Sequence, residues 1–137
     1  PSIAVLLVQK EVAVRLAAMP GDMSVLAVSA QIYADTHLGI HVDRSLFTPP
    51  PKVDSQVIIL RTRQSPLVAP EDERALFRVV KAGFAAKRKK LRSSISAGLA
   101  ISKSQAEELL RHADIDPELR AEDLSIEQWL RLAKDAV

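Results

Sequence analysis

Cysteine and asparagine are both missing from this sequence of 137 residues. The lack of cysteine excludes a disulfide framework, thiolate catalysis and cysteine-ligated metal sites. The lack of asparagine means that a catalytic motif needing an asparagine amide has to lie outside this chain. Glycine is scarce, and the four glycines are too far apart to form a Gly-rich phosphate or dinucleotide loop. A self-contained nucleotide-cofactor enzyme of the usual kind is therefore excluded.

Long hydrophobic runs are missing as well. The longest, Ile3 to Val8, is far shorter than the roughly 20 residues that a membrane span needs. No basic segment precedes it, as one would in a signal peptide. With 47% hydrophobic and 26% charged residues, the composition is that of a globular protein. We therefore expect a cytoplasmic protein with no membrane partner.

The first 64 residues predict part of an α/β domain. The β-branched run from Ile3 to Val8 is typical of a parallel strand that is buried on both faces. Helical spacing follows it, and further strands are predicted for residues 39–42 and 55–61. A buried parallel strand needs neighbours that nothing upstream supplies, so we expect a truncated domain.

Residues 65–137 predict a separate, all-helical domain. An apolar stripe starts at Phe77 and continues as far as Ile95, and either Gly83 or the basic run after it breaks the stripe into two helices. Two later helices each open with a capping box, Ser102-x-x-Gln105 and Ser125-x-x-Gln128. The second half is therefore predicted to be a small helical bundle.

A formal net charge of +2 hides an uneven distribution. Residues 1–102 hold 14 Lys and Arg against 8 Asp and Glu, whereas residues 103–137 hold 5 against 9. Most of the excess lies in one run on the predicted helix, and no acid occurs between Glu73 and Glu107. Such an uncompensated run favours contacts with RNA or DNA phosphates over a merely solvated helix face. The run comprises Lys87, Arg88, Lys89, Lys90 and Arg92.

A proline-rich loop runs from Phe47 to Ser55, and its successive prolines predict a rigid, extended conformation. Two roles are open for Phe47, which either stacks on an unpaired base or plugs the core. Asp54 is either a general base or, more commonly for such a position, a turn cap. The loop is thus a second candidate site.

The end of the first predicted strand is a third candidate, because open α/β sheets bind ligands at the carboxyl ends of their strands. Gln9, Lys10 and Glu11 occupy that position. The histidines are scattered along the chain, and we expect no metal site.

Four motifs occur in one order along the chain: Val8-Gln9-Lys10-Glu11-Val12-x-x-Arg15-Leu16, Phe47-x-Pro49-x-Pro51-Lys52-Val53-Asp54-Ser55, Phe84-x-x-Lys87-Arg88-Lys89-x-Leu91 and Arg120-Ala121-Glu122-Asp123-Leu124-Ser125. Together they resemble the C-terminal half of the ribosomal RNA adenine dimethyltransferases, the kasugamycin-resistance methyltransferase family. The resemblance runs across essentially the whole chain. Pro50 departs from the family pattern as an extra proline and is expected to stiffen the loop.

The resemblance implies an α+β fragment. Residues 1–64 would be the last strands and helices of a class I (Rossmann-like) methyltransferase sheet, and residues 65–137 a small all-α RNA-recognition domain. The complete enzyme would use S-adenosylmethionine to dimethylate N6 of two adjacent adenines near the 3′ end of small-subunit rRNA. In the family the cofactor loop and the catalytic motif precede the strand that opens this chain. We therefore expect a missing N-terminal half as partner, no cofactor bound by this fragment and no activity of the fragment alone.

The resemblance also implies roles for single residues. Phe47 matches an aromatic wall against the target adenine. Lys52 and the basic run are expected to bind small-subunit rRNA in the 30S precursor. A possible active-site rim comprises Gln9, Lys10, Glu11, Pro49 and Pro51. The alternative is a non-catalytic nucleic-acid-binding or ribosome-assembly module.

Overall fold

The computed structural model describes residues 2–136, and the chain divides into two compact units. Unit 1 comprises Pro1–Ala18 and Leu26–Leu67, and unit 2 comprises Met19–Val25 and Val68–Val137. The main division at Leu67 lies close to the boundary expected from the sequence, between residues 64 and 65. Unit 2 also takes in residues 19–25, which the sequence assigned to the first domain.

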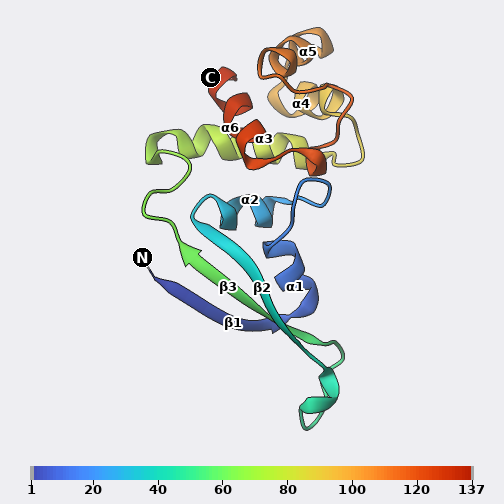
Figure 1. The fold of residues 1–137 in the computed structure, drawn as a ribbon. Coiled ribbons are helices and arrows are strands. Elements are labelled where there is room, and N and C mark those ends of the chain that lie inside the picture. The colour runs from blue at the N-terminus through green and yellow to red at the C-terminus, as the bar shows by residue number, and fades with distance from the viewer. Residues whose placement is uncertain (1, 137) are drawn as a thin grey trace. The chain divides into compact units, whose positions relative to one another are not determined.

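Unit 1 is built on a three-stranded sheet in the order β1-β3-β2 (Figure 1). The central strand β3 (Ser55–Thr62) pairs antiparallel with both β1 (Ile3–Gln9) and β2 (Ala34–Val42). A register shift between Leu38 and His41 interrupts the second pairing. β2 begins five residues before the strand predicted for residues 39–42, and β3 matches its predicted range to within one residue.

β1 differs from the doubly buried parallel strand that its sequence predicted. In the part of the chain that the structure describes, its only strand partner runs antiparallel, and side chains on both faces are exposed, Val5 by 64% and Leu6 by 44%. An apolar β-branched run favours extended backbone, but it holds no information on the direction of the neighbouring strand. Nor does the run show which part of the protein would bury its apolar side chains.

Two short helices complete the regular structure beside the sheet: α1 (Lys10–Leu16) and α2 (Val25–Gln31). The Gln31 side-chain amide ties them together by donating to the carbonyl oxygens of Leu16, at 3.0 Å, and Ala18, at 2.9 Å. A 3-10 turn, η1 (Arg44–Leu46), lies in the loop between β2 and β3.

In the described part of unit 2, the elements that follow β3 along the chain are all helical. They are η2 (Pro70–Asp72), α3 (Glu73–Ala85), α4 (Leu91–Leu99), α5 (Lys103–His112), η3 (Ala121–Asp123) and α6 (Ile126–Asp135). Both predicted capping boxes are confirmed. In the first, the backbone N–H of Gln105 donates to Ser102 Oγ at 3.0 Å, and the N–H of Ser102 donates to Gln105 Oε1 at 3.0 Å. None of the helices within residues 2–136 is both long and apolar enough to cross a membrane.

The turn between α3 and α4 corrects the prediction for the basic run. Lys87, Arg88 and Lys89 lie in this turn and not on a helical ridge. The helix is broken in the basic run because Ala86 leaves helical geometry, with φ −130° and ψ 59°, and Lys90 is extended. Gly83 lies inside α3 and does not break it.

Candidate nucleic-acid interface

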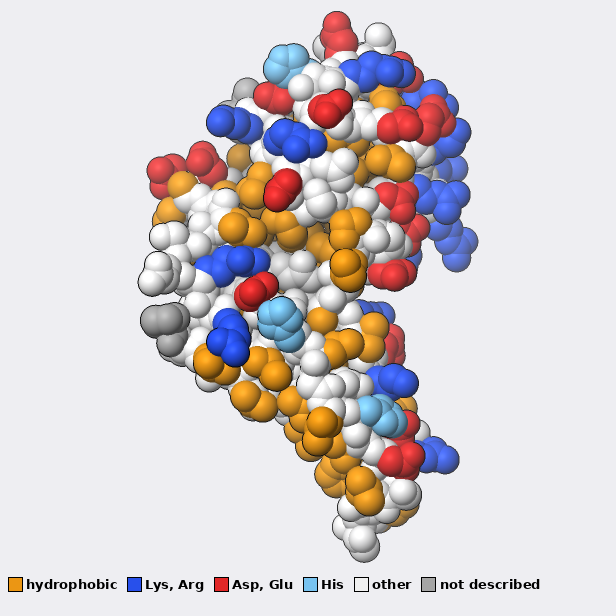
Figure 2. Space-filling model, viewed as in Figure 1, with side chains coloured by type: hydrophobic (Ala, Val, Ile, Leu, Met, Phe, Trp, Pro, Cys, Tyr) orange, Lys and Arg blue, Asp and Glu red, His pale blue; other side chains and the backbone are white. Residues whose placement is uncertain are grey.

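The three cations of the α3–α4 turn are the first part of the predicted RNA-binding run. Lys87, Arg88 and Lys89 are exposed, and among the described residues none of them forms an ion pair. Figure 2 shows Lys and Arg side chains gathered where this turn lies in Figure 1. A hydrogen bond from the Lys89 N–H to the Ala86 carbonyl, 2.9 Å, holds the turn. The turn thus presents three uncompensated positive charges on a fixed backbone, which suits phosphate groups.

Lys90 and Arg92 behave differently from the three residues before them. The Lys90 ammonium pairs with Glu118, and the Arg92 guanidinium lies 3.1 Å from Glu118 and 3.3 Å from Glu107. The hydrogen bond from Lys90 lowers the pKa of Glu118, and the charge of Arg92 adds to the effect. These pairs fasten the start of α4 to α5 and to the 116–119 turn. Of the predicted cluster of five, two cations are thus ion-paired, and the other three have no ion pair within residues 2–136.

Phe47 lies in the loop between β2 and β3, which Figure 1 shows extending beyond the sheet. Its side chain is half-buried, whereas the neighbouring Leu46 is 75% exposed. Although its prolines predicted an extended conformation, the segment from Phe47 to Ser55 is not extended throughout, because it bends over residues 47–49 and 52–53. The Thr48–Pro49 peptide is cis. Pro49 and Pro51 are exposed.

Asp54 closes the base of this loop. Its carboxylate accepts the Arg44 backbone N–H at 2.8 Å and lies 3.1 Å from His41 Nε2. Its carbonyl oxygen accepts the Lys10 N–H at 3.0 Å, which joins the loop to the start of α1. The Arg44 guanidinium donates to the Lys52 carbonyl at 3.2 Å. Of the two roles open from the sequence, this geometry is that of the turn cap.

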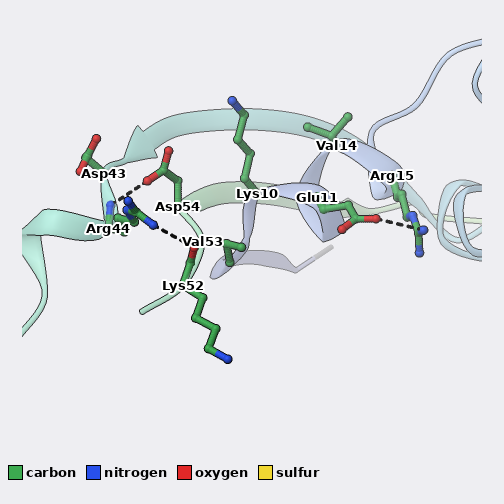
Figure 3. Close-up of a pocket in the computed structure, with 9 residues that line it drawn as sticks. All are labelled: Lys10, Glu11, Val14, Arg15, Asp43, Arg44, Lys52, Val53 and Asp54. Atoms are coloured by element: carbon green, nitrogen blue, oxygen red, sulfur yellow. Dashed lines mark hydrogen bonds and ion pairs between the residues drawn. The ribbon is translucent and has the colours of Figure 1, made fainter. Parts of the chain in front are cut away.

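The predicted rim and the loop meet at a hollow of about 660 Å³ (Figure 3). Its carboxylates are all engaged, and the N–H of Ser45 donates to Asp43 at 2.9 Å and lowers the pKa of that carboxyl. Lys10 and Lys52 form no ion pair within the described chain, but Figure 3 shows their ammonium groups pointing to opposite sides. The two cations therefore do not converge on one ligand. The lining residues are Lys10, Glu11, Val14, Arg15, Asp43, Arg44, Lys52, Val53 and Asp54.

The structure does not bring all predicted residues together. Gln9, Phe47, Pro49 and Pro51, which belong to unit 1 like the hollow itself, do not line it. Lys10, Glu11 and Lys52 are the predicted site residues that do share it.

Sequence reasoning missed the exposed cations of α3. Arg74, Arg78 and Lys81 are exposed at positions i, i+4 and i+7 of this helix. They line a hollow of about 810 Å³ together with Phe77. Their helical spacing and the absence of acids from residue 74 to residue 106 were the signals available in the sequence.

The four glycines, all within residues 2–136, do not form a Gly-rich cofactor loop. A Cβ atom on Gly39, Gly83 or Gly98 would meet side chains of this chain itself, at 2.7, 2.6 and 2.4 Å, so these glycines serve internal packing. Gly21 has open space around it, but no second glycine joins it. Within residues 2–136 no cluster of three or more His, Cys, Asp or Glu is suited to a metal ion.

Comparison with known proteins gives a consistent set of relatives. The profile of the family described as ribosomal RNA adenine dimethylase matches residues 2–136. Ribosomal RNA small subunit methyltransferase A of Nostoc sp. is 44% identical over 131 residues, which are 94% of this chain and 47% of that protein. The protein of the same name from Dehalococcoides mccartyi is 38% identical over 132 residues, 96% of this chain and 45% of that protein. This chain thus spans about half the length of these curated relatives.

Two solved structures resemble the fold. The 23S rRNA methyltransferase ErmE matches with a TM-score of 0.73 and 28% identity, over 97% of this chain and 54% of that one. A dimethyladenosine transferase from Plasmodium falciparum matches with a TM-score of 0.74 and 27% identity, over 95% of this chain and 55% of that one.

Proposed function

This chain belongs to the ribosomal RNA adenine dimethylase family, and from this membership we propose that it is the target-binding part of an rRNA adenine-N6,N6-dimethyltransferase. The complete enzyme modifies two adjacent adenines near the 3′ end of small-subunit rRNA. The observation that carries this proposal is the α3–α4 turn. Its three cations have no carboxylate partner in the part of the chain that the structure describes, and a backbone hydrogen bond closes the turn. Backbone phosphates are the ligands that such a turn selects.

In this proposal unit 1 is the end of a Rossmann-like methyltransferase sheet, and the helices of unit 2 form the RNA-recognition domain. The β1-β3-β2 order and the match to about half of each solved methyltransferase support the first assignment. The cationic turn supports the second. Lys90 and Arg92 contribute by holding the turn in place through Glu118 and Glu107.

Phe47 supplies the surface on which the target adenine stacks. The half-buried Phe47 side chain leaves part of its surface accessible, as a stacking platform requires. The Asp54 hydrogen bonds position the loop that carries this ring. Lys52 adds a phosphate contact near the hollow, and the rim around the target base comprises Gln9, Lys10, Glu11, Pro49 and Pro51.

The S-adenosylmethionine site lies in the other half of the enzyme. The poor fit of the four glycines to that cofactor supports this placement. This chain alone then binds and orients rRNA in the cytoplasm but transfers no methyl group. The contribution of orientation to such a reaction is of the order of several kcal/mol.

The test compares this chain with a Lys87→Glu, Arg88→Glu, Lys89→Glu variant in binding to a 30S precursor at two salt concentrations. We expect the variant to bind more weakly and with a shallower salt dependence, because it loses phosphate contacts. Unchanged affinity overturns the RNA-binding role of the turn.

A second measurement addresses the catalytic part of the proposal. Joined to an N-terminal methyltransferase half, the chain should support dimethylation of the two adenines. If the joined protein binds rRNA but transfers no methyl group, the non-catalytic module is the better description.

A further inference from the structure

The exposed face of α3 is a second cationic surface beside the turn. Arg74, Arg78 and Lys81 lie on one side of the helix, and within residues 2–136 none of them forms an ion pair. Arg74 and Lys81 are seven positions apart, about 10.5 Å along the helix axis, so the three cations form a row and not a single point of positive charge. The three side chains therefore match a short stretch of nucleic-acid backbone.

The hollow that these cations line also contains an aromatic side chain. Phe77 is half-buried there, between Arg74 and Arg78 in sequence, and a single carboxylate, Glu73, shares the lining. Three cations against one acid leave the hollow of about 810 Å³ with a positive balance. An aromatic side chain among cations is the combination that binds single-stranded nucleic acid, because bases stack on the ring while cations follow the backbone.

We propose that this face of α3 binds a single-stranded segment of the same rRNA, with Arg74, Arg78 and Lys81 on its phosphates and an unpaired base against Phe77. The proposal rests on the proposed function, because it takes rRNA as the ligand. The helix runs directly into the α3–α4 turn, so the two surfaces follow one another along a single segment of unit 2. The RNA-binding surface then extends over residues 74–89 and not over the turn alone.

The test uses three charge-matched variants of the full 137-residue chain, each with three cations changed to Gln. One variant changes Arg74, Arg78 and Lys81, and a second changes Lys87, Arg88 and Lys89. The control changes Lys103, Arg111 and Lys134, which are exposed on α5 and α6. The probe is a small-subunit rRNA 3′-end fragment with single-stranded flanks, and circular dichroism verifies that every variant is folded.

We expect the α3 variant to bind the probe at least tenfold more weakly than the control does. The slope of log K against log salt should fall by about 2, since about 0.7 is lost for each phosphate contact to a single strand. Phe77→Leu keeps an apolar side chain but removes the ring. It should lower the affinity for the probe with single-stranded flanks more than the affinity for a probe without them.

The outcomes separate the two proposals. If the α3 variant matches the control while the turn variant binds weakly, the inference about α3 is overturned and the role of the turn stands. If neither differs from the control, or the unmodified chain does not bind, both are overturned.

Discussion

The Cη2 atom of Trp129 lies 2.6 Å from the place that a Cβ atom on Gly83 would occupy. The indole of α6 therefore rests directly on the backbone of α3, and its ring centroid is 5.6 Å from that of Phe84. Trp129 is fully buried. This contact joins the helix that leads into the cationic turn to the last helix of the bundle.

Gly83→Ala should destabilise the chain. Alanine is a better helix former than glycine and should add about 1 kcal/mol to the free energy of unfolding. Overpacking against the indole should lower it by about 1–3 kcal/mol, so we expect a net decrease. Urea unfolding followed by circular dichroism measures it. In a Trp129→Phe background the smaller ring leaves room for the methyl group, so the loss should shrink. An equal loss in both backgrounds would show that the ring contact is not its cause.

Arg92→Gln should lower stability, whereas Lys89→Gln should not. Arg92 joins Glu107 and Glu118, while Lys89 forms no ion pair among the described residues. Because the Arg92 side chain is 36% exposed, solvent screens the pairs and the loss should stay below about 1 kcal/mol. Thermal unfolding at low and high salt measures this, and the difference between the two variants should narrow as salt rises. Equal melting temperatures of the two variants at low salt would contradict the conclusion that Arg92 contributes to stability through its ion pairs and Lys89 does not.

Asp54→Ala should loosen the loop that carries Phe47, while Asp54→Asn should retain most of its order. The asparagine side chain keeps an oxygen for the Arg44 N–H, which the alanine lacks. Hydrogen exchange of the Arg44 amide should therefore be faster in the alanine variant and close to that of the unmodified chain in the asparagine variant. Unchanged protection in the alanine variant would show that other contacts order the loop.

Phe47→Ala in the complete enzyme should reduce methylation about 5- to 150-fold, because base stacking contributes about 1–3 kcal/mol per base. Binding of rRNA should change much less, since phosphate contacts dominate it. Leu46→Ala is the matched control, because Leu46 is next to Phe47 in the chain and is 75% exposed. Equal losses of methylation and binding would indicate a packing role for Phe47.

The features that the sequence predicted well depend on neighbours along the chain. The capping boxes of Ser102 and Ser125 join residues three positions apart, and both are confirmed. The direction of β1 and the pairing of Lys90 with Glu118 depend on partners far away in sequence. The sequence predicted a parallel β1, whereas its partner β3 is antiparallel, and it did not predict the pairing of Lys90 with Glu118. The ion pairs of Lys90 and Arg92 could not be predicted from the basic run itself, because Glu107 and Glu118 lie in other parts of the chain.

His112 gives the chain a pH-dependent contribution to stability. A hydrogen bond of 3.0 Å to Asp135 raises the pKa of His112, and the charge of that carboxylate acts in the same direction. A His whose pKa is higher in the folded state stabilises the fold below its unfolded pKa, about 6.5, and loses this contribution as pH rises through the folded value. The chain should therefore lose part of its stability between about pH 5.5 and about pH 8.

His112→Gln tests this contribution, because it removes the imidazole whose pKa is raised. The variant should be less stable than the unmodified chain at the acidic end of the range, and the two should converge at the alkaline end. Because the His112 side chain is 78% exposed, the effect should be small and should weaken with salt. Urea midpoints at both pH values measure it. A constant difference between the two proteins at both pH values would mean that His112 acts through packing and not through its charge.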